Sequence, residues 1–345
     1  MGVTIKDIAR AASVSTAAVS LAINNRPGIS EKTRSKIRRI AKELHYIPNL
    51  AARSLISQRS LTIGVIITDI TDPFYPQLAR SIEETADERG YSMILCNSDG
   101  DFRRERHGLE NLMGKQVDGI ILSSTFSEGP AIDLLVEKGF PFVFTNRIPV
   151  NHPLGDDIDY VIIDNYAGGY RAVEHLYRIG HDKIAIIAAH MTASNMIERA
   201  RGARSAMKEY GMHCNPDYFI TCEYSRRRAL LAAKGLLAMK DPPTAFFVQD
   251  DNLALGVREA ILSSGARIPE DVGLVGFDDI DFAGVTGVEL TTVSHRSDEM
   301  GTLATEILIN KIENSAVGTM NKIVLEAELI IRKTCGHHLK GYVRP

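Results

Sequence analysis

The sequence predicts a small all-α headpiece followed by an α/β core of two Rossmann-like subdomains. Three short helical patterns fit within the first 45 of the 345 residues. From Leu61 onward, short apolar strands alternate with longer helical patterns, an order typical of parallel sheets covered by helices on both faces. About 230 residues of this alternation exceed one open sheet, so we expect two subdomains.

The three helical patterns of the headpiece each begin at a side chain suited to capping. The first helix is expected over Ile5–Ala12, with Asp7 placed to complete a capping box, and the second over Thr16–Asn24. A helix, a short turn and a second short helix form the helix-turn-helix pattern, whose second helix enters the major groove of DNA. The expected N-caps of the three helices are Thr4, Ser15 and Ser30.

The outer face of the second helix is small and mostly polar. At 100° per residue it carries Ala17, Ser20, Leu21 and Asn24, with Thr16 at its edge. A leucine on the solvent side of so short a helix needs a partner, and the methyl group of thymine is a suitable one. A helical bundle with no role in DNA binding is the alternative, and Leu21 argues against it.

The charge is divided unevenly along the chain, although the formal net charge is only −3. Residues 1–60 hold eleven Lys and Arg against three acids, a balance of +8, and the remaining residues carry −11. A basic segment on an acidic body is typical of a polyanion-binding module joined to a different functional unit. We therefore expect a nucleic-acid partner whose binding weakens with added salt.

Several classes of protein are excluded by what the sequence lacks. No apolar run approaches 18 residues and no signal segment opens the chain, so we expect a cytoplasmic protein. Nucleophile, zinc-protease and nucleotide-binding motifs are missing, which predicts no enzyme activity, no cofactor and no metal site. The adjacent His337 and His338 are expected to be solvated. Reduced, structural thiols are expected at Cys96, Cys214, Cys222 and Cys335.

The headpiece resembles the DNA-binding head of the lactose/galactose-repressor family in the runs Val3–Ala9, Val14–Ser20 and Tyr46–Asn49. The resemblance implies a homodimeric repressor whose two headpieces bind the half-sites of a near-palindromic double-stranded operator. Many members carry Arg where this chain has Leu21, so we expect a preference for T or A there. The resemblance places Ser15, Thr16, Ala17, Ser20, Leu21 and Asn24 in the major groove, and Thr4, Ser30, Thr33 and Tyr46 mostly at phosphates.

A hinge is expected over 48–60, because this segment is too short to form a stable helix alone in water. In the family the matching stretch folds into a helix in the minor groove, where its leucine inserts between the central base pairs. An ordinary linker is the alternative. The resemblance assigns the minor-groove contacts to Asn49, Ala52 and Leu55.

The body resembles the same family and, more distantly, the periplasmic sugar-binding proteins. The markers include Asp72–Tyr75, Gly276–Asp279 and Leu290–Val293. The resemblance implies a periplasmic-binding-protein-like core in which the chain crosses between subdomains near 163, 290 and 322. The expected divisions of the chain are a headpiece over 1–47, a hinge over 48–60, a core over 61–333 and a tail over 334–345. Within the core, the N-subdomain is expected over about 61–162 and 291–321, and the C-subdomain over about 163–290 and 322–333.

The cleft between the subdomains is the expected effector site, since ligands of such folds bind beyond the carboxyl ends of the strands. Paired hydrogen bonds from Asp and Arg suit a sugar or a sugar derivative. Arg199 could instead be a surface arginine, and Asp278 could cap a turn. Asn146 replaces a commoner Asp, and without Trp any stacking must come from Phe or Tyr. The expected effector-binding residues are Phe74, Tyr75, Ser123, Asn146, Arg147, Arg199, Tyr224, Asp250 and Asp278.

Two function classes fit these features. The first is an effector-controlled transcriptional repressor, which the headpiece and the hinge favour. The second is a solute-binding protein that uses the same cleft for uptake. A variant of the first is a catabolite-control type of regulator, in which a protein co-regulator replaces the small molecule. The tail lacks a leucine heptad, so we expect a dimer and no tetramer.

Overall fold

The computed structural model describes residues 3–46, 59–123, 130–149, 158–189, 191–212, 215–314 and 320–339. The chain divides into two compact units, Met1–Ser60 and Leu61–Pro345. The hinge residues Asn49, Ala52 and Leu55 lie outside the described residues.

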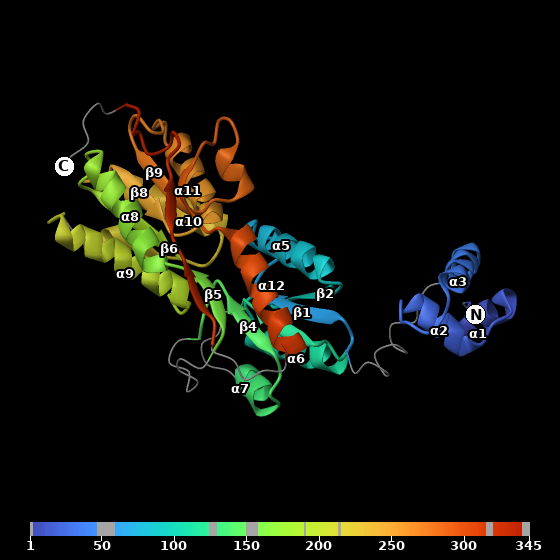
Figure 1. Ribbon diagram of the computed structural model, residues 1–345. Coiled ribbons are helices and arrows are strands. Elements are labelled where there is room, and N and C mark those ends of the chain that lie inside the picture. Colours follow the sequence, from blue (N-terminus) through green and yellow to red (C-terminus); the bar gives the residue numbers. More distant parts are fainter. Residues whose placement is uncertain are drawn as a thin grey trace. The chain divides into compact units, whose positions relative to one another are not determined.

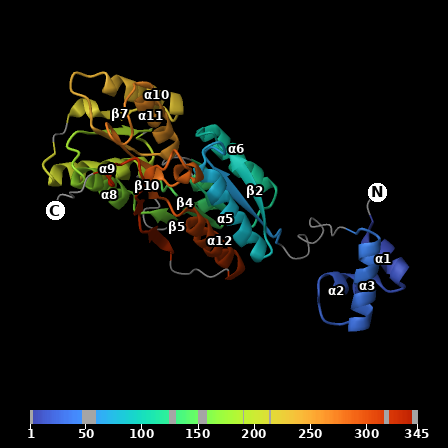
Figure 2. The same cartoon turned by 90° about the horizontal axis from the view of Figure 1, so that it is seen from above.

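The headpiece consists of α1 (Ile5–Ala12), α2 (Thr16–Ile23) and α3 (Glu31–Glu43), which confirms the three predicted helices (Figure 2). The caps are also present. Thr4 donates from N and Oγ1 to the Asp7 carboxylate at 3.0 and 2.7 Å. Ser15 Oγ accepts from the Ala18 amide at 3.1 Å, and Ser30 Oγ from the Thr33 amide at 3.2 Å. The small core buries Ile8, Ala9, Ala12, Val19, Ala22, Ile37 and Ile40.

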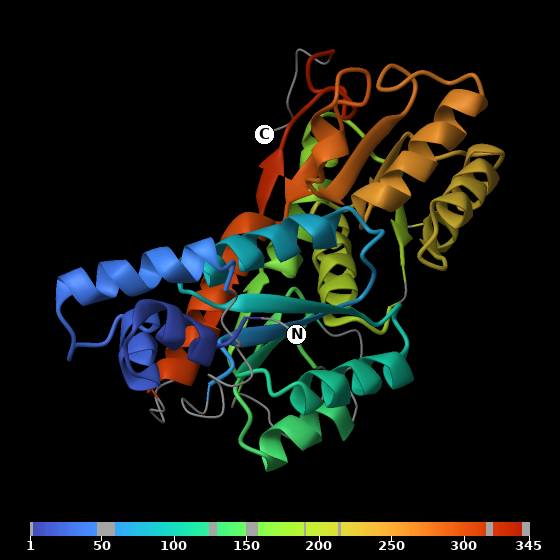
Figure 3. The same ribbon diagram turned by 90° about the vertical axis from the view of Figure 1, so that its right-hand side faces the viewer.

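The first sheet of the core has the strand order β11-β5-β4-β3-β1-β2, and all neighbouring strands are parallel. Helices α5 (Phe74–Glu88) and α12 (Ser297–Asn314) pack against one another on one face, and α6 (Phe102–Gly114) covers the other (Figure 3). The strands are β1 (Thr62–Ile67), β2 (Ser92–Asn97), β3 (Gly119–Leu122), β4 (Phe142–Thr145), β5 (Tyr160–Ile163) and β11 (Lys322–Leu325), and α7 (Pro130–Glu137) lies between β3 and β4 in the chain.

The second sheet has the order β12-β10-β9-β8-β6-β7, with β12 antiparallel to β10 and all other pairs parallel. Ile184 and Ile186 of β6 point to the face covered by α8 (Asn165–Arg178) and α9 (Ser194–Glu209), which lie side by side in Figure 1. The opposite face is covered by α10 (Arg226–Leu237) and α11 (Asp251–Ser263). The strands are β6 (Ile184–Ala188), β7 (Phe219–Thr221), β8 (Ala245–Val248), β9 (Gly273–Asp278), β10 (Thr291–Ser294) and β12 (Glu328–Ile330), with short 3-10 helices η1 (Pro216–Tyr218) and η2 (Asp281–Gly284).

Two glycines let α8 and α9 approach closely. A Cβ atom on Gly169 would lie 2.1 Å from the carbonyl oxygen of Arg199, and one on Gly202 would lie 1.9 Å from that of Tyr166. Both distances are far shorter than any van der Waals contact, so neither position accepts a side chain without separating the helices. This close approach brings Arg199, on α9, under the carboxyl ends of the second sheet.

The chain crosses between the two sheets later than the sequence predicted. β10 pairs with β9 in the second sheet, so the second crossing follows Ser294 instead of falling near 290. β11 pairs with β5 in the first sheet, so the third crossing lies at 326–327, after β11, and not near 322. Short strands such as β10 and β11 carry no local signal for their sheet, because the sheet is decided by the pairing partners and not by the strand's own residues. β9 runs to Asp278, so the carboxylate of that residue lies at the carboxyl end of the strand.

Both sheets have a switch in strand order at equivalent places. β1 lies between β3 and β2 in the first sheet, and β6 lies between β8 and β7 in the second. Crossover connections leave in opposite directions at such a point, which opens a crevice beyond the carboxyl ends of the strands. The fold therefore favours binding at these ends.

Candidate functional site

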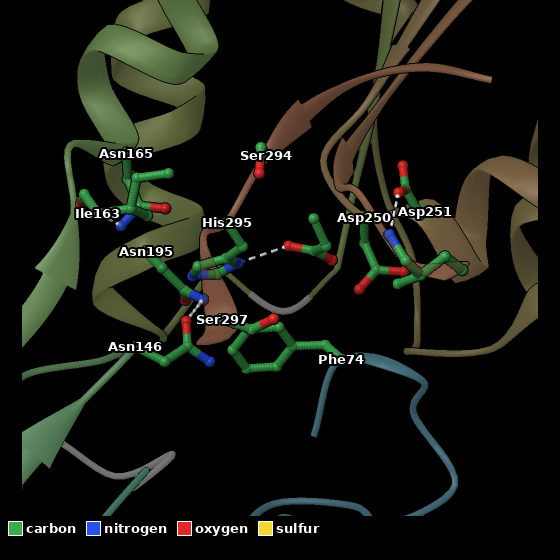
Figure 4. Close-up of polar contacts among 12 residues, drawn as sticks. Phe74, Asn146, Ile163, Asn165, Asn195, Asp250, Asp251, Ser294, His295 and Ser297 are labelled. Atoms are coloured by element: carbon green, nitrogen blue, oxygen red, sulfur yellow. Dashed lines mark hydrogen bonds and ion pairs between the residues drawn. The ribbon is translucent and has the colours of Figure 1, made fainter. Parts of the chain in front are cut away.

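Polar and aromatic side chains follow the carboxyl ends of strands in both sheets. Ser123 follows β3 and Asn146 follows β4, while Phe74 and Tyr75 open α5 after β1. Asp250 caps α11 after β8, Asp278 ends β9, and His295 follows β10. Figure 4 shows the side chains of Phe74, Asn146, Asn195, Asp250 and His295 gathered in one region.

Arg199 is a fully engaged guanidinium at the centre of this region, with only 1% of its surface exposed. Nε donates to Asn165 Oδ1 at 2.8 Å, and Nη1 donates to the carbonyl oxygen of Gln249 at 2.6 Å. Nη1 also forms an ion pair with Asp278 Oδ1 at 3.2 Å, and Cζ lies 3.5 Å above the centre of the Phe277 ring. Arg199 is therefore not a surface arginine. Its hydrogen bonds to Asn165 and Gln249 fix the guanidinium, which in turn holds Asp278 in position.

Asp278 has an unusual backbone conformation, with φ of 118°. A non-glycine residue in this region is strained by roughly 1–3 kcal/mol and persists only where its surroundings hold it. Here Arg199 pairs with the carboxylate, and His295 Nδ1 lies 2.9 Å from Oδ1. Such strain is concentrated at functional sites, so the conformation of Asp278 supports a role in binding.

Aromatic rings from the first subdomain form one wall of the region. The Phe74 ring stacks on the imidazole of His295 with centroids 4.4 Å apart and planes inclined by 31°, and meets Tyr75 edge-on at 5.0 Å. The Tyr75 hydroxyl donates to Thr68 Oγ1 at 2.9 Å. Phe74 and Tyr75 are both buried, so the predicted apolar wall is built against the crossing segment that holds His295.

Carboxylates from both subdomains face each other near Tyr224. Its hydroxyl donates to Asp250 Oδ2 at 2.8 Å, while Asp250 Oδ1 caps α11 by accepting from the Leu253 amide at 2.9 Å. Burial, with the nearby negative charge of Asp278, raises the pKa of Asp250 to about 7. Burial and the charges of Asp250 and Asp278 also raise the pKa of Asp72 well above its ordinary value. The region is therefore rich in acceptors and repels a further negative charge.

Residues at the start of α9 form hydrogen bonds that link the subdomains across the cleft. Asn195 Nδ2, on α9, donates to Asn146 Oδ1 at 3.1 Å, and Ser194 Oγ accepts from the Ile148 amide at 3.1 Å. Asn146 takes a left-handed conformation with φ of 64°, which asparagine tolerates better than most residues. These bonds hold the end of β4 against the start of α9.

Four buried polar atoms in this region have no hydrogen-bond partner among the described residues: Ser123 Oγ, Thr145 Oγ1, Arg147 Nε and His295 Nε2. Three of these atoms belong to residues at the ends of neighbouring strands of the first sheet: Ser123 follows β3, Thr145 ends β4 and Arg147 lies just after β4. An unpaired buried polar group costs about 1–3 kcal/mol, so a cluster of them is a place where a ligand with several hydroxyl groups gains hydrogen bonds. The arrangement can bind a small polyhydroxylated molecule.

Three residues of this cluster were not predicted from the sequence: Asp72, Asn195 and His295. The signal for His295 was present, since a polar residue directly follows the segment Thr291–Ser294. That segment was not recognised as a strand. Asn195 carries no comparable signal, because it lies inside the first turn of a helix that the pattern did not delimit.

The headpiece presents the predicted polar face. Ser15, Thr16, Ala17 and Asn24 are exposed, and Asn24 Nδ2 turns back to the Ser20 carbonyl oxygen at 3.0 Å. Ser30 Oγ and Thr33 Oγ1 lie 2.8 Å apart at the start of α3. Tyr46 packs against the core of the headpiece.

Leu21 and Arg34 depart from the simple picture of an outer face. Leu21 is half-buried, and a Cβ atom on Gly28 would lie 3.2 Å from its Cδ1, so the turn after α2 already gives this leucine a neighbour. The premise that Leu21 is a solvent-facing leucine without a partner was therefore wrong. Arg34 is buried and donates to the carbonyl oxygens of Leu21 and Arg26 at 3.1 and 2.8 Å. It fixes the turn between α2 and α3 and is not a free surface charge.

The described ranges contain neither a metal-binding cluster nor a membrane-spanning helix. No group of three or more His, Cys, Asp or Glu side chains there could hold a metal ion. No helix of those ranges is long and apolar enough to cross a membrane. Cys96, Cys222 and Cys335 are free thiols, and Cys214 lies outside the described residues.

Comparison with known proteins matches both units. A family model described as "Bacterial regulatory proteins, lacI family" matches residues 4–49, and one described as "Periplasmic binding proteins and sugar binding domain of LacI family" matches residues 60–333. The chain is 36% identical over 309 residues to the ribose operon repressor of Escherichia coli (strain K12). The aligned region covers 90% of this chain and 93% of that protein.

Two solved structures extend the match to three dimensions. The lac repressor dimer bound to operator and the anti-inducer ONPF superposes with a TM-score of 0.86 at 27% identity, over 97% of this chain and 99% of that one. A LacI family transcriptional regulator from Enterococcus faecium with bound ribose superposes with a TM-score of 0.70 at 28% identity, over 79% and 98%.

The headpiece, the two-sheet core and these matches define a bacterial regulator with a ligand-binding body. The chain belongs to the lacI family of bacterial regulatory proteins. It is a DNA-binding transcriptional regulator, as the sequence predicted. The alternative of a solute-binding protein accounts for the core alone and leaves the match over residues 4–49 without a role.

Proposed function

We propose that this chain represses transcription as a homodimer in the cytoplasm, where two headpieces bind the halves of a palindromic operator and a sugar in the cleft controls the binding. The observation that carries the proposal is the cluster of buried, unpaired polar atoms at the carboxyl ends of the strands. A regulator with no ligand gains nothing from leaving these atoms unpaired. No catalytic role is proposed.

The headpiece supports operator binding. Thr16 and Ala17 are exposed at the start of α2, which is the end of a recognition helix that contacts base edges. Lys36, Arg38, Arg39 and Lys42 are exposed on α3, where their charges favour phosphate. Ser15, Ser20, Leu21 and Asn24 are proposed as further major-groove contacts, and Thr4, Ser30, Thr33 and Tyr46 as phosphate contacts.

The cleft supports a sugar as the effector. Asp250 and Asp278 offer acceptors to hydroxyl groups, while Phe74 offers an apolar face on which the carbons of a sugar ring can pack. The cluster of carboxylates disfavours an anionic ligand such as a sugar phosphate. The proposed binding residues are the nine predicted ones: Phe74, Tyr75, Ser123, Asn146, Arg147, Arg199, Tyr224, Asp250 and Asp278. Ribose is a candidate, since one relative is a ribose operon repressor and one similar structure contains ribose.

The effector acts through the hinge in this proposal. A ligand changes DNA affinity only if it binds one arrangement of the subdomains better than another. The bond between Asn146 and Asn195 belongs to one such arrangement, since it spans the cleft. Asn49, Ala52 and Leu55 are proposed as the minor-groove contacts that the arrangement of the core controls.

The test is a thermal-shift screen of the full-length protein against neutral sugars, sugar phosphates and nucleobases. A ligand at 100 times its dissociation constant adds about 2.7 kcal/mol of stability, which shifts the midpoint measurably. D-ribose or another neutral sugar is expected to raise it. The operator is then selected from random duplex DNA, and its affinity is measured by fluorescence anisotropy with and without that sugar.

A catabolite-control type of regulator with a protein co-regulator is the competing proposal. The unpaired atoms of the cleft favour a small molecule over a protein, because they are buried within the core. If only sugar phosphates or nucleobases raise the unfolding midpoint, the proposal of a neutral sugar as effector is contradicted. If none of the compounds raises it, the proposal of a small-molecule effector is contradicted.

A further inference from the structure

His295 is a buried histidine at the centre of the cleft that the sequence did not single out. Only 1% of its surface is exposed, and it lies where the chain leaves β10 for α12. Figure 4 shows its ring beside Asn195 and over Phe74. On the other side of the ring, Nδ1 lies 2.9 Å from Asp278 Oδ1. The ring therefore contacts side chains from both subdomains.

The contacts of His295 assign its proton. Nδ1 lies 2.9 Å from Oδ1 of Asp278, and the ion pair with Arg199 favours the ionised carboxylate, which can only accept, so we assign the hydrogen to Nδ1. Arg199 Nη2 is 3.3 Å from the same Nδ1 and cannot also donate to it. Burial and the charges of Arg199 and Arg147 hold the pKa of His295 well below its ordinary value, so the ring is neutral at neutral pH. Nε2 is then an unprotonated acceptor.

This acceptor has no partner in the part of the chain that the structure describes. Burying an acceptor without a donor destabilises the protein, so the position is suited to a donor supplied by a ligand. The opposite ring atom is fixed by Asp278, and stacking on Phe74 restrains the ring plane. The lone pair of Nε2 therefore has a defined direction within the cleft.

We propose that His295 Nε2 accepts a hydrogen bond from one hydroxyl group of the sugar effector and so selects for that hydroxyl. The inference rests on the proposed function. A site that pairs a buried polar atom with one ligand hydroxyl rejects an analogue lacking that group, because the atom then stays buried and unpaired. Asp278 is the positioning residue that sets the tautomer of His295.

Two substitutions separate ligand contact from a structural role. The amide of His295→Asn reaches the place of Nδ1, so it keeps a donor for Asp278 and loses the acceptor. The longer His295→Gln reaches the place of Nε2, so it keeps an acceptor and loses the bond to Asp278. His175→Gln is the matched control, because His175 lies on α8 against Cys335 and contacts neither Asp278 nor Phe74.

The binding measurement is isothermal titration of the full-length wild type and the three variants with D-ribose and its 2-, 3- and 5-deoxy analogues. His295→Asn is expected to weaken D-ribose binding about tenfold or more, with His295→Gln closer to the wild type and His175→Gln unchanged. The deoxy analogue that lacks the hydroxyl group paired with Nε2 should bind the wild type and His295→Asn equally, because neither protein can form that hydrogen bond with it. Full affinity for D-ribose in His295→Asn, with loss of affinity in His295→Gln, would give His295 only a structural role and overturn the proposal. The proposal would also be overturned if the ratio of the wild-type to the His295→Asn dissociation constant were the same for all four sugars.

A second measurement decides the proposal without a ligand. Nitrogen-15 NMR of imidazole rings distinguishes the two neutral tautomers, and the His295 signals are those missing from the spectrum of His295→Gln. The Nδ1–H tautomer is expected in the free protein. An Nε2–H tautomer would overturn the proposal, because that atom could not accept. Failure of D-ribose to bind the wild type would count against the proposed effector and not against the tautomer, which is measured without a ligand.

Discussion

The side chain of Asn195 donates a hydrogen bond of 3.1 Å to Oδ1 of Asn146, and this bond joins the two subdomains across the cleft. Asn146 follows a strand of the first sheet, and Asn195 lies in the first turn of a helix that covers the second. Both side chains are buried. The pair therefore belongs to an arrangement of the core that an effector can favour or oppose.

Asn195→Ala is expected to weaken effector binding about tenfold, because loss of the donor leaves a buried carbonyl oxygen of Asn146 unpaired when the cleft closes. Calorimetric titration with the sugar found in the thermal screen measures the change. Asn252→Ala is the control, since Asn252 bonds to Arg226 on the opposite side of the second sheet. Equal affinities of Asn195→Ala and the wild type would remove the bond from the binding mechanism.

Asp278→Asn is expected to abolish the response to the effector and to leave operator affinity intact. The amide keeps the size of the side chain but removes the charge that pairs with Arg199 and faces the cleft. Fluorescence anisotropy on labelled operator, with and without the sugar, gives both quantities. Loss of operator binding together with an unchanged sugar affinity would show that Asp278 is not part of the effector site.

Asp250→Asn is expected to change how stability depends on pH. The ordinary pKa of 3.8 applies to the unfolded chain, while burial first and Asp278 second raise that of folded Asp250 to about 7. Folding thus takes up a proton between these values, and stability from this group falls as the pH rises through that window. Asparagine does not titrate and still caps α11.

Thermal melting at intervals from pH 5 to pH 8 tests this directly. The midpoint of Asp250→Asn should rise relative to the wild type as the pH increases. The exposed Asp217→Asn is the control and should follow the wild type throughout. A difference between Asp250→Asn and the wild type that is constant over the range would contradict the raised pKa.

Gly202→Ala is expected to lower the stability of the core by roughly 1–3 kcal/mol, because overpacking forces helices apart. Its Cβ would meet the carbonyl oxygen of Tyr166 at 1.9 Å, and Arg199 one turn earlier would move with the helix. Gly235→Ala on the exposed side of α10 has nothing within 4 Å and should stabilise by about 0.5–1 kcal/mol. Chemical denaturation measures both, and a neutral Gly202→Ala would show that α8 and α9 separate freely.

Leu21→Arg is expected to change the base that the operator must carry. Leucine makes only apolar contacts, so the wild type should prefer T or A at the position facing Leu21. Arginine can pair with guanine, which is worth roughly 1–3 kcal/mol of discrimination. Selection from random duplex DNA with both proteins compares them. A mandatory guanine in the sites selected by the wild type would contradict the proposed contact.

The headpiece could be predicted almost completely because its determinants are local. A capping side chain, a face of apolar residues at helical spacing and a turn define each helix within a dozen residues, and all three helices are present. Leu21 shows the limit of this reasoning. Its place on the outer face follows from helical geometry, but its proximity to Gly28 depends on how the next turn folds back.

The core was predicted less evenly, and the errors have one cause. The alternation of short strands and helices was predicted, whereas the divisions predicted near 290 and 322 placed the short strands β10 and β11 in the wrong sheets. The sheet that a short strand joins is decided by its pairing partners, which its own few residues do not encode. The two crossings predicted near 290 and 322 were wrong for that reason.

The sequence by itself determined the order of elements, the basic headpiece on an acidic body and most of the polar residues at the strand ends, because periodicity, capping and charge act over short distances. Only the tertiary structure decided which of these side chains meet. The ion pair of Arg199 with Asp278, the stack of Phe74 on His295 and the unpaired Nε2 each require segments about 80 to 220 residues apart to fold together. No local pattern encodes such contacts, since they arise from the packing of two sheets around one cleft.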